Sequence, residues 1–229
     1  MTRSSLIWCL LPCALHAQDN ATLDAIIATK RFHVPGQGVQ LDLHVSVLGS
    51  SAEWKTNDHG RQQAHVEALT IIERDTAIID FRKSDVLGPE QVDTAKSDFL
   101  IEEHFLLQPG EYTLSVELHD LNGPADNRSE WKGPLVIPAL GKGITFSDAL
   151  LTAGTHTDAQ GNQVPAPYTG TYYPPEVEKL GFYTEIYGAD QVFGGDSLFT
   201  INYQIESYES HTVKGQFKGV ARAKAAPVV

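Results

Sequence analysis

Cysteine is nearly absent from this chain. Its two cysteines, Cys9 and Cys13, both lie within the first 17 residues. Residues 1–17 carry one basic side chain, Arg3, then an apolar run from 6 to 15 and a small residue at Ala17, which is the layout of a cleavable secretory signal. Cleavage would leave a mature chain without cysteine, which excludes disulfides and thiol chemistry. We therefore expect an exported protein that is periplasmic, associated with the outer membrane or extracellular.

Long hydrophobic runs and positive charge are also scarce. The apolar run of the signal falls far short of the ~20 residues that a membrane-spanning helix needs, and no later run approaches that length. The sequence has 17 Lys and Arg against 29 Asp and Glu, so its formal net charge is −12. Nucleic-acid binding depends on clustered basic residues. The sequence thus predicts no transmembrane segment and no nucleic-acid partner.

Enzyme motifs are missing as well. The chain has no Gly-x-Ser-x-Gly elbow, no His-Glu-x-x-His helix, no phosphate-binding loop and no zinc spacing of Cys and His. This favours a protein that is not an enzyme and needs no cofactor. A metal-dependent hydrolase stays open as an alternative, because outward-facing polar residues of neighbouring strands could converge as zinc requires, although a solvated sheet face explains them more simply. These residues are Asp42, His44, His65, Glu67, Glu102, Glu103 and His104.

The most informative stretch that is present runs from 99 to 120. It predicts two extended strands that meet at a corner formed by Leu107, Pro109, Gly110 and Tyr112. After the corner, apolar and polar residues alternate with period two, as in a half-buried antiparallel strand. A tyrosine directly after such a turn matches the tyrosine corner of immunoglobulin-like sandwiches.

Turn residues divide the rest of the chain into further strands. Residues 28–139 form a first domain with seven expected strands, preceded by an N-terminal segment, 18–27, in which Leu23, Ile26 and Ile27 suggest a helical turn. The Pro- and Gly-containing stretch 138–143 predicts a linker. The expected strands of the first domain are 28–34, 39–47, 62–72, 76–83, 99–107, 111–119 and 131–137.

Residues 140–229 form a second expected domain. Four strands are predicted there, at 144–151, 180–187, 198–206 and 216–223, with a Pro- and Tyr-rich loop at 164–175 running extended over the surface. Because this half has few strands and no second corner, we expect it to be truncated, with the missing strands supplied by a partner or by a missing C-terminal part of the same protein. The predicted fold is all-β: two tandem immunoglobulin- or fibronectin-III-like sandwiches, the second incomplete.

An ordered set of segments resembles the N-terminal region of GWxTD domain-containing proteins, a secreted group of the Bacteroidota and their relatives. The segments are Arg31-Phe-His-Val, TAIIDF at 76–81, LQPGEYTLSVELHD at 107–120, Phe146-Ser-Asp, and GFYTEIY at 181–187. The motif Gly-Trp-x-Thr-Asp itself is absent, so no activity of that module is transferred. The resemblance implies a secreted or envelope-associated β-sandwich region.

The residue types alone suggest two possible ligand sites. Asp120, Asn122, Asp126 and Asn127 place four oxygen-bearing side chains in one loop, which calcium could use, although the same residues are typical of tight turns. Tyrosine suits sugar or protein recognition because it has a flat apolar face and a polar tip. Seven of the eight tyrosines follow residue 140. We expect a binding platform at Tyr168, Tyr172 and Tyr173.

Together these patterns favour a non-catalytic secreted or cell-envelope β-sandwich protein with a structural or protein-interaction role. The first alternative is a carbohydrate-binding accessory module that uses the Tyr-rich loop. The second alternative is the metal-dependent hydrolase.

Overall fold

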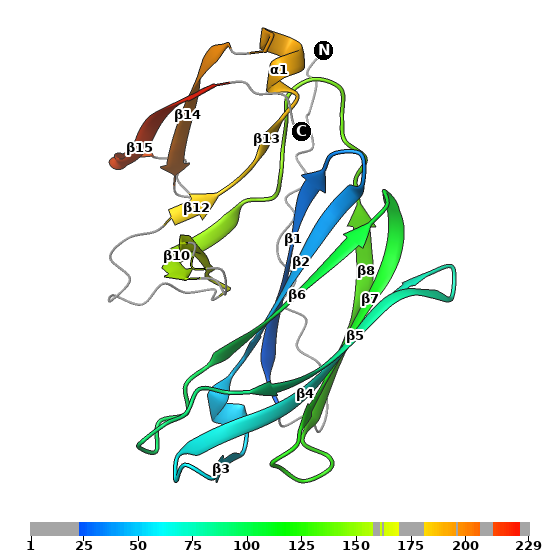
Figure 1. Cartoon of the computed structure of the whole chain (residues 1–229), viewed down its shortest axis with the longest axis vertical. Helices are drawn as coiled ribbons and strands as arrows, with labels where there is room; N and C mark the ends of the chain where they lie inside the picture. Colours follow the sequence, from blue (N-terminus) through cyan, green and yellow to red (C-terminus); the bar gives the residue numbers. More distant parts are fainter. Residues whose placement is uncertain are drawn as a thin grey trace, which may run out of the picture. The chain divides into compact units, whose positions relative to one another are not determined.

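The structure is a computed structural model that describes residues 23–157, 161, 163–169, 181–195, 197–206 and 213–224. Its regular secondary structure consists almost entirely of antiparallel strands, which confirms the all-β prediction (Figure 1). Contacts divide the chain into two compact units whose segments alternate in sequence. Among the described residues, the first unit contains 23–28, 44–103 and 112–135, and the second contains 29–43, 104–111 and those from 136 to 224. The expected boundary between residues 139 and 140 stays a prediction.

Two sheets form the sandwich. One has the strand order β1 (Ala25–Val34), β2 (Gly38–Val47), β6 (Phe99–Leu107). The other joins β3 (Trp54–Thr56), β4 (Gln62–Arg74), β5 (Ala77–Leu87), β7 (Gly110–Asp120) and β8 (Arg128–Ile137). Residues 66–73 of β4 pair with both β5 and β7. A strand has two edges, so β5 and β7 must flank β4 on opposite sides.

The core follows the period-two pattern of the sequence. Along β4 the even-numbered residues Ala64, Val66, Ala68 and Ile72 are buried, while the odd-numbered ones are only partly covered. Strand β7 repeats this pattern with Leu114, Val116 and Leu118. Burying each large aliphatic side chain contributes about 1.5–3 kcal/mol relative to exposure. The alternation that predicted these strands therefore also supplies their stability.

The predicted corner joins β6 to β7. Leu107 and Tyr112 are both buried there. The Arg74 guanidinium carbon lies 5.5 Å from the centre of the Tyr112 ring, a distance at which a cation is attracted to an aromatic face. Pro109 and Gly110 lie between the two buried side chains, at the turn itself.

All seven strands expected in the first domain are present, and β6 has the predicted limits. The expected helical turn around Leu23, Ile26 and Ile27 is wrong, because Ile26 and Ile27 belong to β1, where pairing with β2 overrides the local helical spacing. The short strand β3 and a 3₁₀ turn at Gly49–Ser51 were not predicted.

The remainder of the second unit consists of short strands and one short helix. Each of the expected strands 144–151 and 180–187 is divided in two, and the expected strands 198–206 and 216–223 are confirmed as a hairpin. The tandem arrangement of two sandwiches stays a prediction. The observed elements are β9 (Thr145–Phe146), β10 (Leu150–Thr157), β11 (Gln163–Pro167), β12 (Gly181–Tyr183), β13 (Ile186–Tyr187), α1 (Ala189–Phe193), β14 (Leu198–Glu206) and β15 (Val213–Lys224).

In the part of the chain that the structure describes, no helix combines the length and the hydrophobicity needed to cross a membrane.

Candidate functional site

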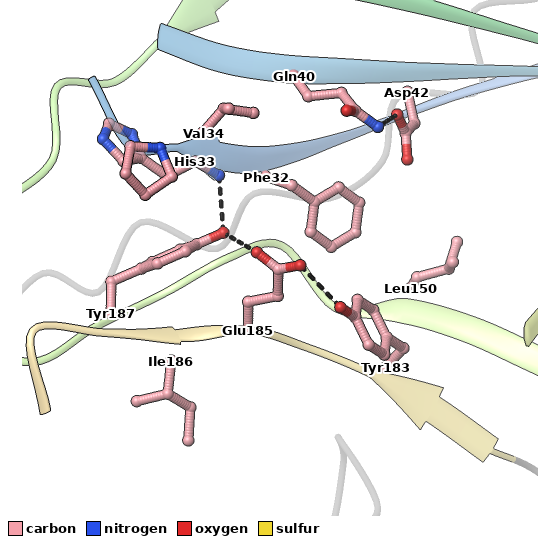
Figure 2. A pocket seen from close by; sticks show the side chains of 11 residues that line it. Phe32, His33, Val34, Gln40, Asp42, Leu150, Tyr183, Glu185, Ile186 and Tyr187 are labelled. Carbon is pink, nitrogen blue, oxygen red and sulfur yellow. Dashed lines mark hydrogen bonds between the residues drawn. The ribbon is translucent and has the colours of Figure 1, made fainter. Parts of the chain in front are cut away.

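A groove of about 740 Å³ lies in the second unit (Figure 2). The hairpin of β1 and β2 supplies one wall through Phe32, His33 and Asp42, and residues 183–187 supply the other. Apolar side chains line much of it, while a few polar groups converge between the walls. This composition is typical of sites that bind small molecules or peptide segments.

Residues 183–187 present Tyr183, Glu185 and Tyr187 on one side because alternate residues of an extended chain share a face. The backbone at Glu185 is held by Ser147. The Glu185 N–H donates to Ser147 Oγ at 2.8 Å, and the Ser147 N–H donates to the Glu185 carbonyl at 2.9 Å. These bonds fix the segment between β12 and β13, where strand pairing is interrupted.

Glu185 joins the two tyrosines in a network that we call the Glu185 network. The Tyr183 hydroxyl donates to Glu185 Oε1 at 2.7 Å, and the Tyr187 hydroxyl donates to Oε2 at 2.5 Å. The Tyr187 oxygen also accepts the backbone N–H of His33 at 2.7 Å. Figure 2 shows this chain of bonds running from β1 to Tyr183. The network thus connects β1 directly to β12 and β13.

The environment of the network favours neutral phenols. Burial, followed by the hydrogen bond to Glu185, raises the pKa of Tyr183 to about 12. The same two causes, in the same order, raise the pKa of Tyr187 further above its ordinary value. Both changes follow because a phenolate beside a carboxylate is disfavoured by desolvation and by like charge. At neutral pH both tyrosines are therefore hydrogen-bond donors and not bases or nucleophiles.

Aromatic rings extend the site beyond its polar groups. The Phe32 and Tyr183 ring centres are 5.7 Å apart at a tilted angle, and His33 meets Tyr187 edge-on at 5.7 Å. Phe32 is buried, whereas Tyr183 remains 41% exposed. Tyr183 is the ring that a ligand in the groove could contact.

An ion pair between Arg31 and Asp148 also holds β1, two residues before His33. Arg31 Nε and one terminal guanidinium nitrogen donate to the two carboxylate oxygens of Asp148 at 2.7 and 3.0 Å. The backbone N–H of Arg31 adds a third bond to Asp148 at 2.9 Å. The hydrogen bond to Asp148 also raises the pKa of the Arg31 guanidinium. This pair fixes the segment between β9 and β10 on β1 and explains why the expected strand 144–151 is divided there.

The polar residues considered for a metal site do not converge at one place but form separate pairs. On β2, Asp42 Oδ1 accepts a bond from Gln40 and lies 2.7 Å from His104 Nδ1. The expectation that all these residues face solvent is wrong for His44 and Glu103. His44 is buried because β2 is covered on both faces at that point, and Glu103 is buried because it lies on the core-facing side of β6.

The remaining residues of that set also stay in small groups. His44 Nε2 lies 3.5 Å from Glu102, while Glu67 pairs with Lys83 and His65 lies near Asp85. Among the residues described, no three His, Cys, Asp or Glu side chains form a group that could hold a metal ion.

The loop considered for calcium is organised around Asp120, whose side chain is completely buried. Its carboxylate accepts the backbone N–H groups of Glu53, Asn122 and Gly123 and the side-chain amide of Asn127, at 2.7–3.1 Å. Asp126 is exposed. Four N–H donors already occupy the carboxylate, which favours the turn interpretation, and the calcium site stays a prediction.

The expected tyrosine platform is only partly within the described residues. Tyr168 is half-buried beyond β11, and its backbone N–H donates to the Leu151 carbonyl at 2.8 Å. Tyr172 and Tyr173 lie outside the described residues, so the platform stays a prediction.

The sequence patterns did not point to Glu185 and His33 as partners in one site. A local signal was available, since Tyr-x-Glu-x-Tyr at 183–187 has the spacing that places three polar tips on one side of a strand. Nothing in the local pattern indicated that His33, which precedes Tyr187 by 154 residues, would meet it.

Comparisons of the chain with protein-family models and with curated proteins find no match.

Proposed function

We propose that this chain is a non-catalytic, exported protein of the cell envelope that acts through structural or protein–protein contacts. On the resemblance of its sequence, we also propose that it is related to the N-terminal β-sandwich region of GWxTD domain-containing proteins. The secretory layout of residues 1–17 supports export.

One observation carries the interaction role: strand β5 exposes large apolar side chains. Ile78, Ile79, Phe81 and Leu87 are 60%, 49%, 59% and 60% exposed, respectively. Apolar residues gathered on one exposed element are typical of surfaces that bind another protein. We call these four residues the β5 surface.

The absence of catalysis is supported by the chemistry of the groove. The hydroxyls of Tyr183 and Tyr187 both donate to Glu185, and their raised pKa values keep them neutral at physiological pH. A general base or nucleophile needs a pKa near the working pH or an adjacent activating base. The pKa values of these tyrosines lie far above that range, and their bonds to Glu185 instead connect strands.

Photo-crosslinking in the native cell tests the proposal. A benzoylphenylalanine residue replaces Phe81 on the β5 surface, and a matched control places it at Asp126, an exposed loop position of the same unit. We expect an adduct of defined mass in the envelope fraction from position 81 and none from position 126. The same faint, heterogeneous adducts from both positions would contradict the interaction role.

A carbohydrate-binding role is the second candidate, and the groove favours it. Tyr183 exposes its ring there, and the amide of Gln40 and the carboxylate of Asp42 lie among the lining residues. Aromatic faces with neighbouring amides and carboxylates are the groups that recognise sugars.

A glycan array tests this candidate and locates the site. Loss of a bound sugar in Tyr183→Ala would place it in the groove, and loss only in the Tyr172→Ala, Tyr173→Ala variant would place it in the loop. A wild-type chain that binds no sugar would remove this candidate.

A further inference from the structure

Strand β5 is the outer strand of its sheet. It pairs along its length with β4, from His65 opposite Leu87 to Arg74 opposite Ala77, and β7 occupies the other edge of β4. Within the part of the chain that the structure describes, no strand pairs with the second edge of β5. Such an edge offers a row of backbone donors and acceptors to another strand.

The register with β4 determines which backbone groups of β5 lie at this second edge. The Gly88 N–H donates to the Ala64 carbonyl at 2.9 Å, and Ala64 continues the β4–β5 register. In an antiparallel pair, alternate residues direct both backbone groups toward the same partner. Between 80 and 88 the even-numbered residues therefore bond to β4. The odd-numbered residues 81, 83, 85 and 87 direct theirs to the outer edge.

The outer edge is self-complementary about Ser84. Lys83 and Asp85 lie one residue to either side of it, and Phe81 and Leu87 lie three residues to either side. We propose that β5 pairs antiparallel with β5 of a second copy of this chain, with the two Ser84 residues opposite each other. This inference rests on the proposed interaction role and names its partner.

The register follows from charge and hydrophobicity. With the two Ser84 residues opposed, Lys83 of each copy faces Asp85 of the other, and Phe81 faces Leu87. Opposite charges and apolar pairs directly across two strands stabilise a sheet, and like charges destabilise it. A register centred on Lys83 would oppose two lysines, and one centred on Phe81 would place Lys83 against Ile79.

The charge of the whole molecule makes β5 the favourable place for self-association. The chain carries a formal net charge of −12, so two copies repel each other in general. Strand β5 contains two acidic and two basic residues, Asp80, Arg82, Lys83 and Asp85, whose charges cancel. A lysine on an edge strand usually opposes pairing, but here the second copy presents Asp85 to it.

A charge swap tests this contact in the purified full chain. Asp85→Lys places a second positive charge opposite Lys83 of the other copy, at two symmetric places. Within one chain, Asp85 lies directly opposite Glu67 of β4, so the new lysine joins Lys83 beside that carboxylate. The double variant Lys83→Glu, Asp85→Lys restores opposite charges across the contact. Sedimentation equilibrium measures the dimer dissociation constant, and urea unfolding confirms that each variant is folded.

We expect a concentration-dependent dimer, a rise of about tenfold or more in its dissociation constant for Asp85→Lys, and recovery in the double variant. A monomer at all concentrations would overturn the inference, as would a dimer that Asp85→Lys does not weaken. If position 81 instead crosslinks in cells to a protein of another mass, the interaction role stands and the self-pairing falls.

Discussion

At the scale of single residues, this chain uses carboxylates to organise backbone and phenol donors. Asp120 gathers four N–H groups in a buried turn, and Glu185 gathers two tyrosine hydroxyls across a groove. Hydrogen bonds to a charged acceptor contribute more than neutral ones, and leaving buried donors unpaired is costly. Replacing Asp120 should therefore lower the free energy of unfolding, and replacing Glu185 should change the titration of the tyrosines.

Glu185→Gln should lower the pKa of Tyr183 from about 12 without returning it to its ordinary value. The variant removes the charge and changes the hydrogen bond, but burial, the larger cause, remains. Absorbance of tyrosinate at 295 nm against pH measures the change as a difference between variant and wild type. Tyr183→Phe is the control that identifies the titrating ring. An unchanged titration curve would contradict the Glu185 network.

The network also predicts how stability depends on high pH. The pKa of Tyr183 is about 12 in the folded chain and about 10 when unfolded. A group with a raised folded pKa contributes stability that is complete below its unfolded pKa and is lost as pH rises through the folded one. Urea midpoints should therefore fall between about pH 10 and pH 12. They should fall less in Tyr183→Phe, and an equal fall in both proteins would argue against this cause.

Asp120→Ala should destabilise the chain by about 3 kcal/mol or more, because four donors lose their acceptor in a buried site. Urea unfolding with and without calcium distinguishes the two interpretations of the loop. Asp126→Ala is the matched control, since Asp126 is exposed and should change stability by less than about 0.5 kcal/mol. If calcium stabilises the wild type and not Asp120→Ala, the loop is a calcium site and the turn interpretation is incomplete.

At the scale of elements, β4 and β5 are joined by a hairpin loop in which both residues have positive φ. Asp75 and Thr76 form its two-residue loop at φ values of 49° and 69°. Such loops favour glycine at the second position, and a β-branched residue there is strained. Thr76→Gly should therefore raise the free energy of unfolding by about 1 kcal/mol. Gly36→Ala, which introduces a side chain at φ 69°, is the reciprocal control and should lower it. Thermal melts that move in the same direction for both would contradict the argument.

Period-two alternation was the main signal for the strands of the sandwich, and it is clearest in β4, β6 and β7, where one face is buried and the other is more exposed. It failed between 144 and 151, where the strand is interrupted by the contact of Asp148 with Arg31, and around Glu185, where Ser147 holds the backbone. The short helix α1 was missed because five residues give no periodicity. Contacts between segments that are distant in the sequence determine these breaks in the strands, and a local pattern cannot predict such contacts.

The site was predictable only in part for the same reason. Tyrosines were expected to form it, but the groove is lined by Tyr183 and Tyr187, together with residues of β1 and β2. A pattern within 183–187 could have suggested the cluster. Its meeting with His33 depends on the tertiary fold.

At the scale of the whole molecule, a strongly acidic chain contains an edge strand, β5, whose charges cancel and which exposes apolar side chains. Charge repulsion disfavours contact over most of the surface, and strand β5 combines cancelling charges with exposed Phe81 and Leu87. Contact through β5 is therefore the central claim, and it makes a residue-by-residue prediction for the backbone amides.

Amide hydrogen exchange by NMR at two protein concentrations tests that claim most directly. The amides of Arg82, Ser84 and Val86, which bond to β4, should be protected at both concentrations. The amides of Lys83, Asp85 and Leu87 should exchange rapidly in dilute solution and become protected in concentrated solution. Exchange at these three positions that does not depend on concentration would contradict pairing through β5.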